Sequence, residues 1–93
     1  LECLRRIETS ILNRHLSQWI RNFNPPLYRK RPVKIYYITQ SSIKPPTFIL
    51  FTNNPEGIHF SYRRYLINRI REDFGFEGTP IQLNFKPKKR ATS

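Results

Sequence analysis

Residues 47–86 decide the fold, because two strand-like segments here enclose a helix-like segment. Residues 47–53 (TFILFTN) are rich in β-branched and aromatic side chains, and residues 81–86 (IQLNFK) alternate between apolar and polar side chains; both patterns are typical of strands. Between them, residues 62–74 (YRRYLINRIREDF) repeat apolar side chains at helical spacing. A strand, a helix and a strand in this order predict a right-handed crossover between parallel strands.

The predicted helix at 62–74 has an expected start, an expected end and a core face. We expect the Ser61 hydroxyl to cap the first turn, and Gly75 to end the helix in the left-handed conformation. The core stripe should pack against the sheet. It comprises Tyr62, Leu66, Ile70 and Phe74, with Tyr65 beside them.

A further strand is predicted upstream, at residues 34–40 (KIYYITQ), with residues 41–46 joining it to the next strand. Residues 47–53 carry apolar side chains on both faces. We therefore expect that strand to be central in the sheet or covered on both sides. Residues 54–56 (NPE) combine an Asn cap with Pro at the first position, which predicts a short helical turn.

The N-terminal part predicts a first helix that begins near Thr9 or Ser10, either of which can cap its first turn. Residues 25–26 (PP) stop this helix, because proline has no amide hydrogen to donate. Its apolar stripe comprises Leu12, Leu16, Trp19, Ile20 and Phe23. The elements therefore follow the order α-β-β-α-β, and the predicted fold class is α+β.

Composition limits the chain to one domain and to certain classes of protein. The 93 residues carry 17 Lys and Arg against 6 Asp and Glu, a net charge of +11. One Trp, five Tyr and seven Phe provide a core that a disordered basic tail lacks. We expect a single domain at residues 1–86 and a disordered basic tail at residues 87–93.

The sequence excludes a membrane-spanning segment and a disulfide-bonded domain. No apolar run is long enough to cross a membrane, so we expect no membrane partner. Cys3 is the single cysteine, which excludes a disulfide within the chain and fits a reducing compartment. The chain contains no methionine, so we expect it to be a segment of a longer protein.

Residues for catalysis or metal binding are lacking. His15, His59 and Cys3 show no spacing typical of a zinc site, and Glu72 and Asp73 diverge on a helix. No phosphate-binding loop of the GxxxxGK[ST] type is present. We therefore predict no catalytic residue, no metal ligand, no cofactor in this segment and no enzyme activity.

The excess of positive charge predicts a polyanionic partner, although such residues also keep a surface soluble. Tyr36 and Tyr37 could stack on bases, but aromatic residues in strands more often belong to the core. Arg69 can pair with Glu72 or Asp73, which makes it a weaker candidate. The candidate contacts to RNA phosphates are Arg29, Lys30, Arg31, Lys34, Arg63, Arg64, Lys86, Lys88, Lys89 and Arg90.

Residues 7–86 resemble the C-terminal KH-like domain of the Der/EngA family of tandem-domain GTPases. Two irregular strings carry much of the resemblance, residues 59–62 (HFSY) and 74–81 (FGFEGTPI). Residues 34–37 (KIYY) and the upstream Thr9, Leu12, Asn13 and Pro25-Pro26 fit the same domain.

The resemblance implies a KH-like fold, with helices packed on one face of a three-stranded sheet. It implies a non-catalytic RNA-binding and regulatory domain in a GTPase required for assembly of the large ribosomal subunit. The implied partners are ribosomal RNA and the parent's own GTPase domains, for which GTP and Mg²⁺ are implied. We assign His59 and Phe60 to the docking face, and expect a cytoplasmic location and a monomeric fragment.

The chain departs from an ordinary KH domain, which grips a nucleic-acid backbone with a GxxG loop. Residues 58–61 (IHFS) occupy that place without glycine, a lack that the family shares, and Glu56-Gly57 stand where the family tends to have apolar residues. Two other functions stay open: a docking or scaffold domain that regulates the GTPase domains without RNA contact, and a stand-alone enzyme, which lacks a catalytic set.

Overall fold

The computed structural model describes residues 6–76 and 78–88 and confirms the predicted order of elements. The two helices and the three-stranded sheet make the α+β class. The elements are α1 (Thr9–Asn22), β1 (Ile35–Ile43), β2 (Pro46–Thr52), the short 3-10 helix η2 (Pro55–Gly57), α2 (Phe60–Phe74) and β3 (Gln82–Pro87).

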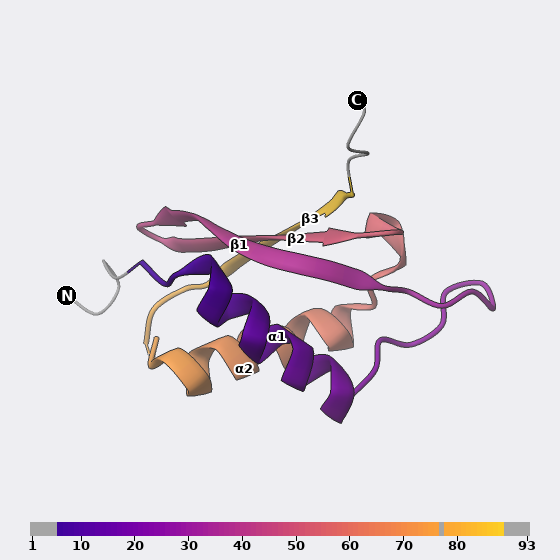
Figure 1. Ribbon diagram of the computed structural model, residues 1–93, viewed down its shortest axis with the longest axis horizontal. Coiled ribbons are helices and arrows are strands. Elements are labelled where there is room, and N and C mark those ends of the chain that lie inside the picture. Colours follow the sequence, from indigo (N-terminus) through magenta and orange to yellow (C-terminus); the bar gives the residue numbers. More distant parts are fainter. Residues whose placement is uncertain (1–5, 77, 89–93) are drawn as a thin grey trace.

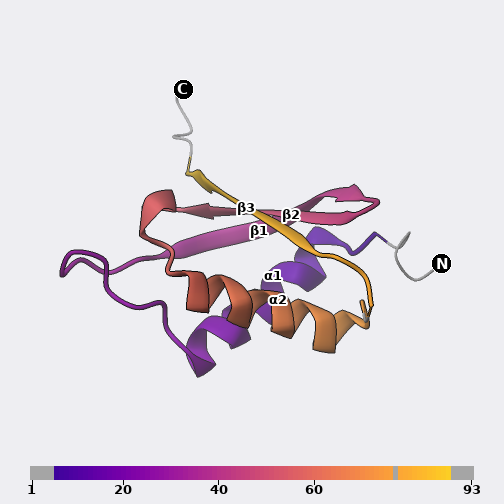
Figure 2. The same ribbon diagram turned by 180° about the vertical axis from the view of Figure 1, so that it is seen from behind.

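The sheet has the order β1-β2-β3, so β2 is central, as predicted. β1 pairs with β2 antiparallel, and β2 pairs with β3 parallel through the α2 crossover. Both helices cover the same face of the sheet, and no described element covers the other face (Figures 1 and 2). We call this uncovered side the open face.

The core lies between the helices and the covered face. Its fully buried side chains come from every layer, because each element turns one apolar stripe inward. Phe76, which follows α2, meets Phe48 of β2 edge to face at 6.3 Å between ring centroids and closes one side of the core. The largest of these side chains are Trp19, Tyr62, Phe48, Phe76, Leu12, Ile38, Leu50, Leu66 and Ile70.

Two predicted helix caps are wrong, although α1 begins at Thr9 as predicted. Glu8 precedes α1 as its N-cap without a side-chain hydrogen bond, so neither Thr9 nor Ser10 caps that helix. α2 begins at Phe60, two residues earlier than predicted, because the His59 ring and not the Ser61 hydroxyl caps its first turn. The Ser61 amide donates to His59 Nδ1 at 3.1 Å. The predicted end is confirmed, since Gly75 has a φ of 78°.

The prediction that Phe74 packs against the sheet is also wrong. Its half-buried ring lies 4.7 Å from the His15 ring and 6.3 Å from the Trp19 ring, measured between centroids, and both of these rings belong to α1. The end of α2 therefore packs on the neighbouring helix. The remaining members of the predicted stripe, Tyr62, Leu66 and Ile70, are buried as expected.

The edge strand β1 is covered by a side chain from α1. Asn13 Oδ1 accepts from the Ile38 amide at 2.9 Å, and Asn13 Nδ2 donates to the Ile38 carbonyl at 3.0 Å. An amide side chain thus replaces the missing neighbouring strand at this position and leaves less edge for pairing with another chain.

β3 extends through Pro87, and the Lys88 amide donates to the Thr52 carbonyl at 3.1 Å. The start of the predicted tail is therefore attached to the sheet, and residues 89–93 lie outside the described residues. Within residues 6–76 and 78–88, no helix is long and apolar enough to span a bilayer.

Candidate nucleic-acid interface

Residues 28–31 (YRKR) form a tight hairpin that protrudes from one end of the molecule (Figure 1). The Tyr28 amide donates to the Arg31 carbonyl at 2.9 Å, and the Arg31 amide donates to the Tyr28 carbonyl at 3.0 Å. Arg29 and Lys30 between them have φ angles of 53° and 67°. Two positive φ angles are typical of a type I′ turn, which strongly favours Asn-Gly. We call residues 28–31 the basic finger.

The basic finger is seated on η2 through Tyr28. A Cβ atom at Gly57 would lie 2.9 Å from Tyr28 Cγ and 3.0 Å from Tyr28 Cβ. Glycine at this buried position therefore makes room for the Tyr28 side chain. The Arg29 guanidinium carbon lies 5.3 Å from the centroid of the Tyr28 ring, within the range of a cation–π contact. Glycine and tyrosine together fix the finger on the body of the domain.

The ends of the strands bring further lysines to the same end of the molecule. The Lys34 amide donates to Asn53 Oδ1 at 2.9 Å, just before β1 and just after β2. Lys88 is attached to the end of β2 by its bond to Thr52, and Lys86 lies opposite Phe51 in the parallel ladder. The side chains of Lys34, Lys86 and Lys88 are exposed.

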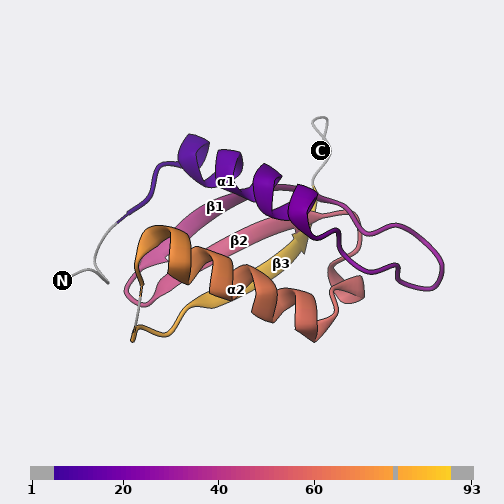
Figure 3. The same cartoon turned by 90° about the horizontal axis from the view of Figure 1, so that it is seen from below.

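α2 also begins at this end, as Figure 3 shows. Its first turns place Arg63 and Arg64 at the surface, and Arg63 also reaches back to the sheet. Arg63 donates to the Leu83 carbonyl at 3.1 Å, and its guanidinium carbon lies 5.1 Å from the centroid of the Phe85 ring. Arg63 thus has a structural role in addition to its charge.

Besides Arg63, which also contacts the sheet, seven exposed cations gather at one end, and we call these seven the basic end. They are Arg29, Lys30, Arg31, Lys34, Arg64, Lys86 and Lys88. Two predicted contacts, Lys89 and Arg90, lie outside the described residues. The sequence clusters thus share one region, which their separation along the chain did not require.

Acidic side chains are concentrated at the opposite end among the described residues. Glu8 precedes α1, and Glu72 and Asp73 lie in the last turn of α2. These two helix ends are both remote from the basic finger (Figure 3). Glu72 pairs with Arg69. Glu56 of η2 is the acidic side chain close to the finger, where it lines a polar groove with Arg29 and Arg31.

Asp73 is the best-connected acid of this remote end. Its Oδ2 accepts from Trp19 Nε1 at 2.7 Å and lies 3.0 Å from His15 Nδ1. Partial burial acts to raise the pKa of the Asp73 carboxyl. The hydrogen bonds from Trp19 and His15, together with the charges of His15 and Arg69, outweigh burial and lower this pKa below its ordinary value. Asp73 therefore joins α1 to α2 as a carboxylate.

His59 and Phe60, the predicted docking residues, lie at the start of α2. Their rings stack with centroids 4.9 Å apart, and Phe60 is 65% exposed. His59 has a structural task as the cap of α2. Their assignment to docking stays a prediction.

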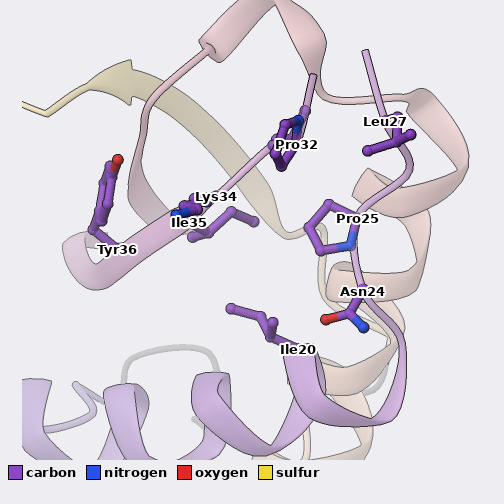
Figure 4. Close-up of a pocket in the computed structure, with 9 residues that line it drawn as sticks. Ile20, Asn24, Pro25, Leu27, Pro32, Lys34, Ile35 and Tyr36 are labelled. Carbon is purple, nitrogen blue, oxygen red and sulfur yellow. The ribbon is translucent and has the colours of Figure 1, made fainter. Parts of the chain in front are cut away.

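An apolar groove lies between the end of α1 and the segment leading into β1. Figure 4 shows Ile20 of α1 pointing toward Ile35, with Pro25, Pro32 and Leu27 along the other side. Leu27 is 67% exposed there. The groove offers apolar contacts and few polar groups, so it suits a protein side chain better than a phosphate.

The open face carries aromatic rings that sequence reasoning did not select as site residues. Tyr37 stacks on Phe51 at 4.7 Å between centroids, and Tyr36 and Tyr37 are each 42% exposed. Both tyrosines therefore lie outside the core. The alternation of residues 47–53 held the signal for Phe51, because Phe51 has the opposite parity to the buried Phe48 and Leu50.

No cluster of three or more His, Cys, Asp or Glu side chains able to hold a metal ion occurs among the described residues. The basic end itself offers charge and hydrogen bonding from Arg and Lys. Such groups can position an anion.

Comparison with known proteins gives one consistent match. Residues 6–86 match the family described as KH-domain-like of EngA bacterial GTPase enzymes, C-terminal. The chain is 52% identical over 85 residues to GTPase Der of Geotalea daltonii, covering 91% of this chain and 19% of that protein. It is 54% identical over 82 residues to GTPase Der of Moorella thermoacetica, covering 88% and 19%. The chain thus spans about a fifth of the length of these curated relatives.

Proposed function

This chain belongs to the KH-domain-like family of the C-terminus of EngA bacterial GTPases, and we propose that it binds RNA through its basic end. In the whole protein, the proposed RNA is ribosomal RNA of the large subunit, bound during ribosome assembly in the cytoplasm. The proposed GTPase activity, with GTP and Mg²⁺, belongs to other domains of that longer protein.

The gathering of seven exposed cations at one end, where Glu56 is the acidic side chain beside the finger, carries this proposal. Lys and Arg bind phosphates by charge and release condensed counterions, which supplies much of the affinity of a protein for nucleic acid. Arg29 and Arg31 add planar guanidinium groups that can donate two hydrogen bonds to one phosphate. The basic finger therefore suits contact with the RNA backbone.

Recognition differs from that of an ordinary KH domain. Residues 58–61 (IHFS) contain no glycine, and His59 within them caps α2. A close backbone approach of the GxxG kind has no counterpart there. Phosphate contacts from side chains replace it in our proposal.

The test uses a variant that keeps the shape of the finger. Alanine at positions 29 and 30 would strain the left-handed turn, so Arg29→Asn with Lys30→Gly is the better change. Fluorescence anisotropy with a fragment of large-subunit ribosomal RNA should show about tenfold weaker binding, as expected for two lost phosphate contacts.

A charge-matched control is Arg14→Ala with Lys44→Ala. Both side chains are exposed, Arg14 on α1 and Lys44 in the turn between β1 and β2. The control should bind RNA within about twofold of the unmodified chain, since it leaves the basic end intact. Equal losses of RNA affinity in both variants would show that net charge alone, and not the basic end, attracts RNA.

Docking on the GTPase domains is a second candidate, favoured by the exposed Phe60 ring and the apolar groove. Phe60→Ser should weaken association with separately produced GTPase domains of the same protein and leave RNA affinity unchanged. Size-exclusion chromatography or calorimetry of the mixture measures the association. Association that does not change in this variant would exclude Phe60 from the docking surface.

A further inference from the structure

The open face presents its side chains in rows that cross all three strands. The register places Tyr37 of β1 opposite Phe51 of β2, and Phe51 opposite Lys86 of β3. The neighbouring row consists of Thr39, Ile49 and Asn84. The first row thus joins two stacked rings to a lysine.

An irregularity in β1 adds a second tyrosine to this face. The register shifts between Ile35 and Tyr37, so Tyr36 is an extra residue in the ladder. Ile35 and Ile38 are buried on the covered face, while Tyr36 and Tyr37 are both exposed. Lys88 Nζ lies 4.5 Å from the centroid of the Tyr36 ring. Each tyrosine ring thus contacts a neighbouring side chain: Tyr37 contacts Phe51, and Tyr36 contacts Lys88.

The middle of these rows is hollowed. Tyr37, Ile49, Phe51, Lys86 and Lys88 line an open depression of about 350 Å³. None of the residues in β1, β2 or β3 is Asp or Glu, so the strands contribute no negative charge to the face. Two lysines beside exposed rings suit a ligand that is both anionic and planar.

We propose that the open face binds an unpaired segment of RNA, with one base stacked on Tyr37 and neighbouring phosphates on Lys86 and Lys88. The proposal rests on the RNA binding proposed above and adds a preference for single strands. Bases stack on aromatic side chains whatever their identity, because every base has a π-face. Bases in a duplex are stacked on one another and do not reach such a surface.

The composition of the face favours RNA over a protein partner. Thr39, Asn84 and Lys86 stand in its rows and Lys88 lines its depression, whereas lysine is depleted from protein–protein interfaces. The face also adjoins the basic end, which shares Lys86 and Lys88 with it. An RNA strand bound at the basic finger can therefore continue along the sheet.

The experiment compares a single-stranded decamer RNA that contains 2-aminopurine with a duplex of the same length. Binding of the unmodified chain to the single strand should quench the 2-aminopurine fluorescence, because the reporter base stacks on Tyr37. Tyr37→Leu should abolish that quenching, weaken single-strand binding by roughly tenfold and leave duplex binding within about twofold. Tyr37→Phe is the matched control, which keeps the ring and should behave as the unmodified chain does.

The results separate this inference from the proposed function. RNA binding with equal affinity for both RNAs, without quenching by the unmodified chain, would overturn base stacking and leave phosphate binding at the basic end intact. Quenching that persists in folded Tyr37→Leu would place the stacked base elsewhere. Absence of binding to either RNA would overturn both proposals and leave the open face to a protein partner.

Discussion

Arg29 and Lys30 stand in a backbone conformation that disfavours residues with a Cβ atom. A left-handed residue costs about 1–2 kcal/mol unless it is glycine, and Asn or Asp is the usual exception. The turn is nevertheless closed by two backbone hydrogen bonds and seated through Tyr28 on Gly57. Strain of this kind often accompanies a functional site, and here it directs two adjacent cations into solvent.

Relief of this strain should stabilise the protein. Arg29→Asn with Lys30→Gly supplies the residues that a type I′ turn prefers, so we expect the free energy of unfolding to rise by about 1 kcal/mol. Urea denaturation of the variant and of the unmodified chain measures the difference. The same variant should bind RNA more weakly. A urea midpoint below that of the unmodified chain would contradict the assignment of strain to this turn.

Gly57 should tolerate no side chain. Gly57→Ala would place a Cβ atom 2.9 Å from Tyr28 Cγ, and the ring cannot move away without shifting the finger. We expect the free energy of unfolding to fall by about 1–3 kcal/mol, as overpacking of a close contact does. Thermal denaturation followed by circular dichroism measures this change. Gly75→Ala or Gly78→Ala is unsuitable as a control, since both positions have positive φ.

α1 and α2 are joined by polar contacts as well as by apolar packing. Tyr62 and Tyr65 of α2 donate to the carbonyls of Phe23 and Trp19 at 2.8 and 2.7 Å, at the end of α1. Burial raises the pKa of both phenols, so they stay protonated as donors. Asp73 completes the joint at the other end of α2.

The contribution of Asp73 should depend on pH. Its folded-state pKa lies below the ordinary value of 3.8, so its stabilisation is complete above that value and is lost as the pH falls through the folded-state pKa. Asp73→Asn should cost about 1 kcal/mol at about pH 5, a value reduced for the solvent exposure of the group. Urea denaturation near pH 5 and near pH 3 should show this difference shrinking. An equal difference at both values would contradict the assigned role.

Periodicity predicted the elements well, and particular contacts explain where prediction stopped. The apolar spacing of residues 47–86 gave the central strand, the helix and the parallel crossover, because burial of one stripe per element dictates that pattern. Phe74 fits the same stripe, yet its ring meets His15 and Trp19. Periodicity identifies an apolar face without identifying which neighbouring element covers it.

The site was predicted in part. Charge counts identified the cations of the basic end, but the left-handed turn at Arg29 and Lys30 lacks the usual Asn-Gly signal. The bulge at Tyr36 also has no local signature, so the strand pattern alone could not place both tyrosines on one face. Arg63 was selected for charge, and the predicted crossover did not indicate that its side chain would also donate to the Leu83 carbonyl.

On the scale of the whole molecule, the charges of the described residues are distributed unevenly. The basic finger, the ends of the strands and the start of α2 hold a cluster of exposed cations, whereas the acids of α2 lie at the remote end of that helix. Such an arrangement orients an approaching polyanion before contact and raises its rate of association. The domain should therefore meet RNA with the basic end first.

The salt dependence of RNA affinity tests this account most directly. If the basic end neutralises roughly four to six phosphates, log affinity should fall against log salt with a slope of about −3 to −5. Arg29→Asn with Lys30→Gly should make that slope shallower by about 1–2, while the Arg14→Ala, Lys44→Ala control keeps the original slope. Anisotropy titrations at several salt concentrations give all three slopes. An identical slope for the folded finger variant and the unmodified chain would contradict the claim that the basic finger binds RNA phosphates.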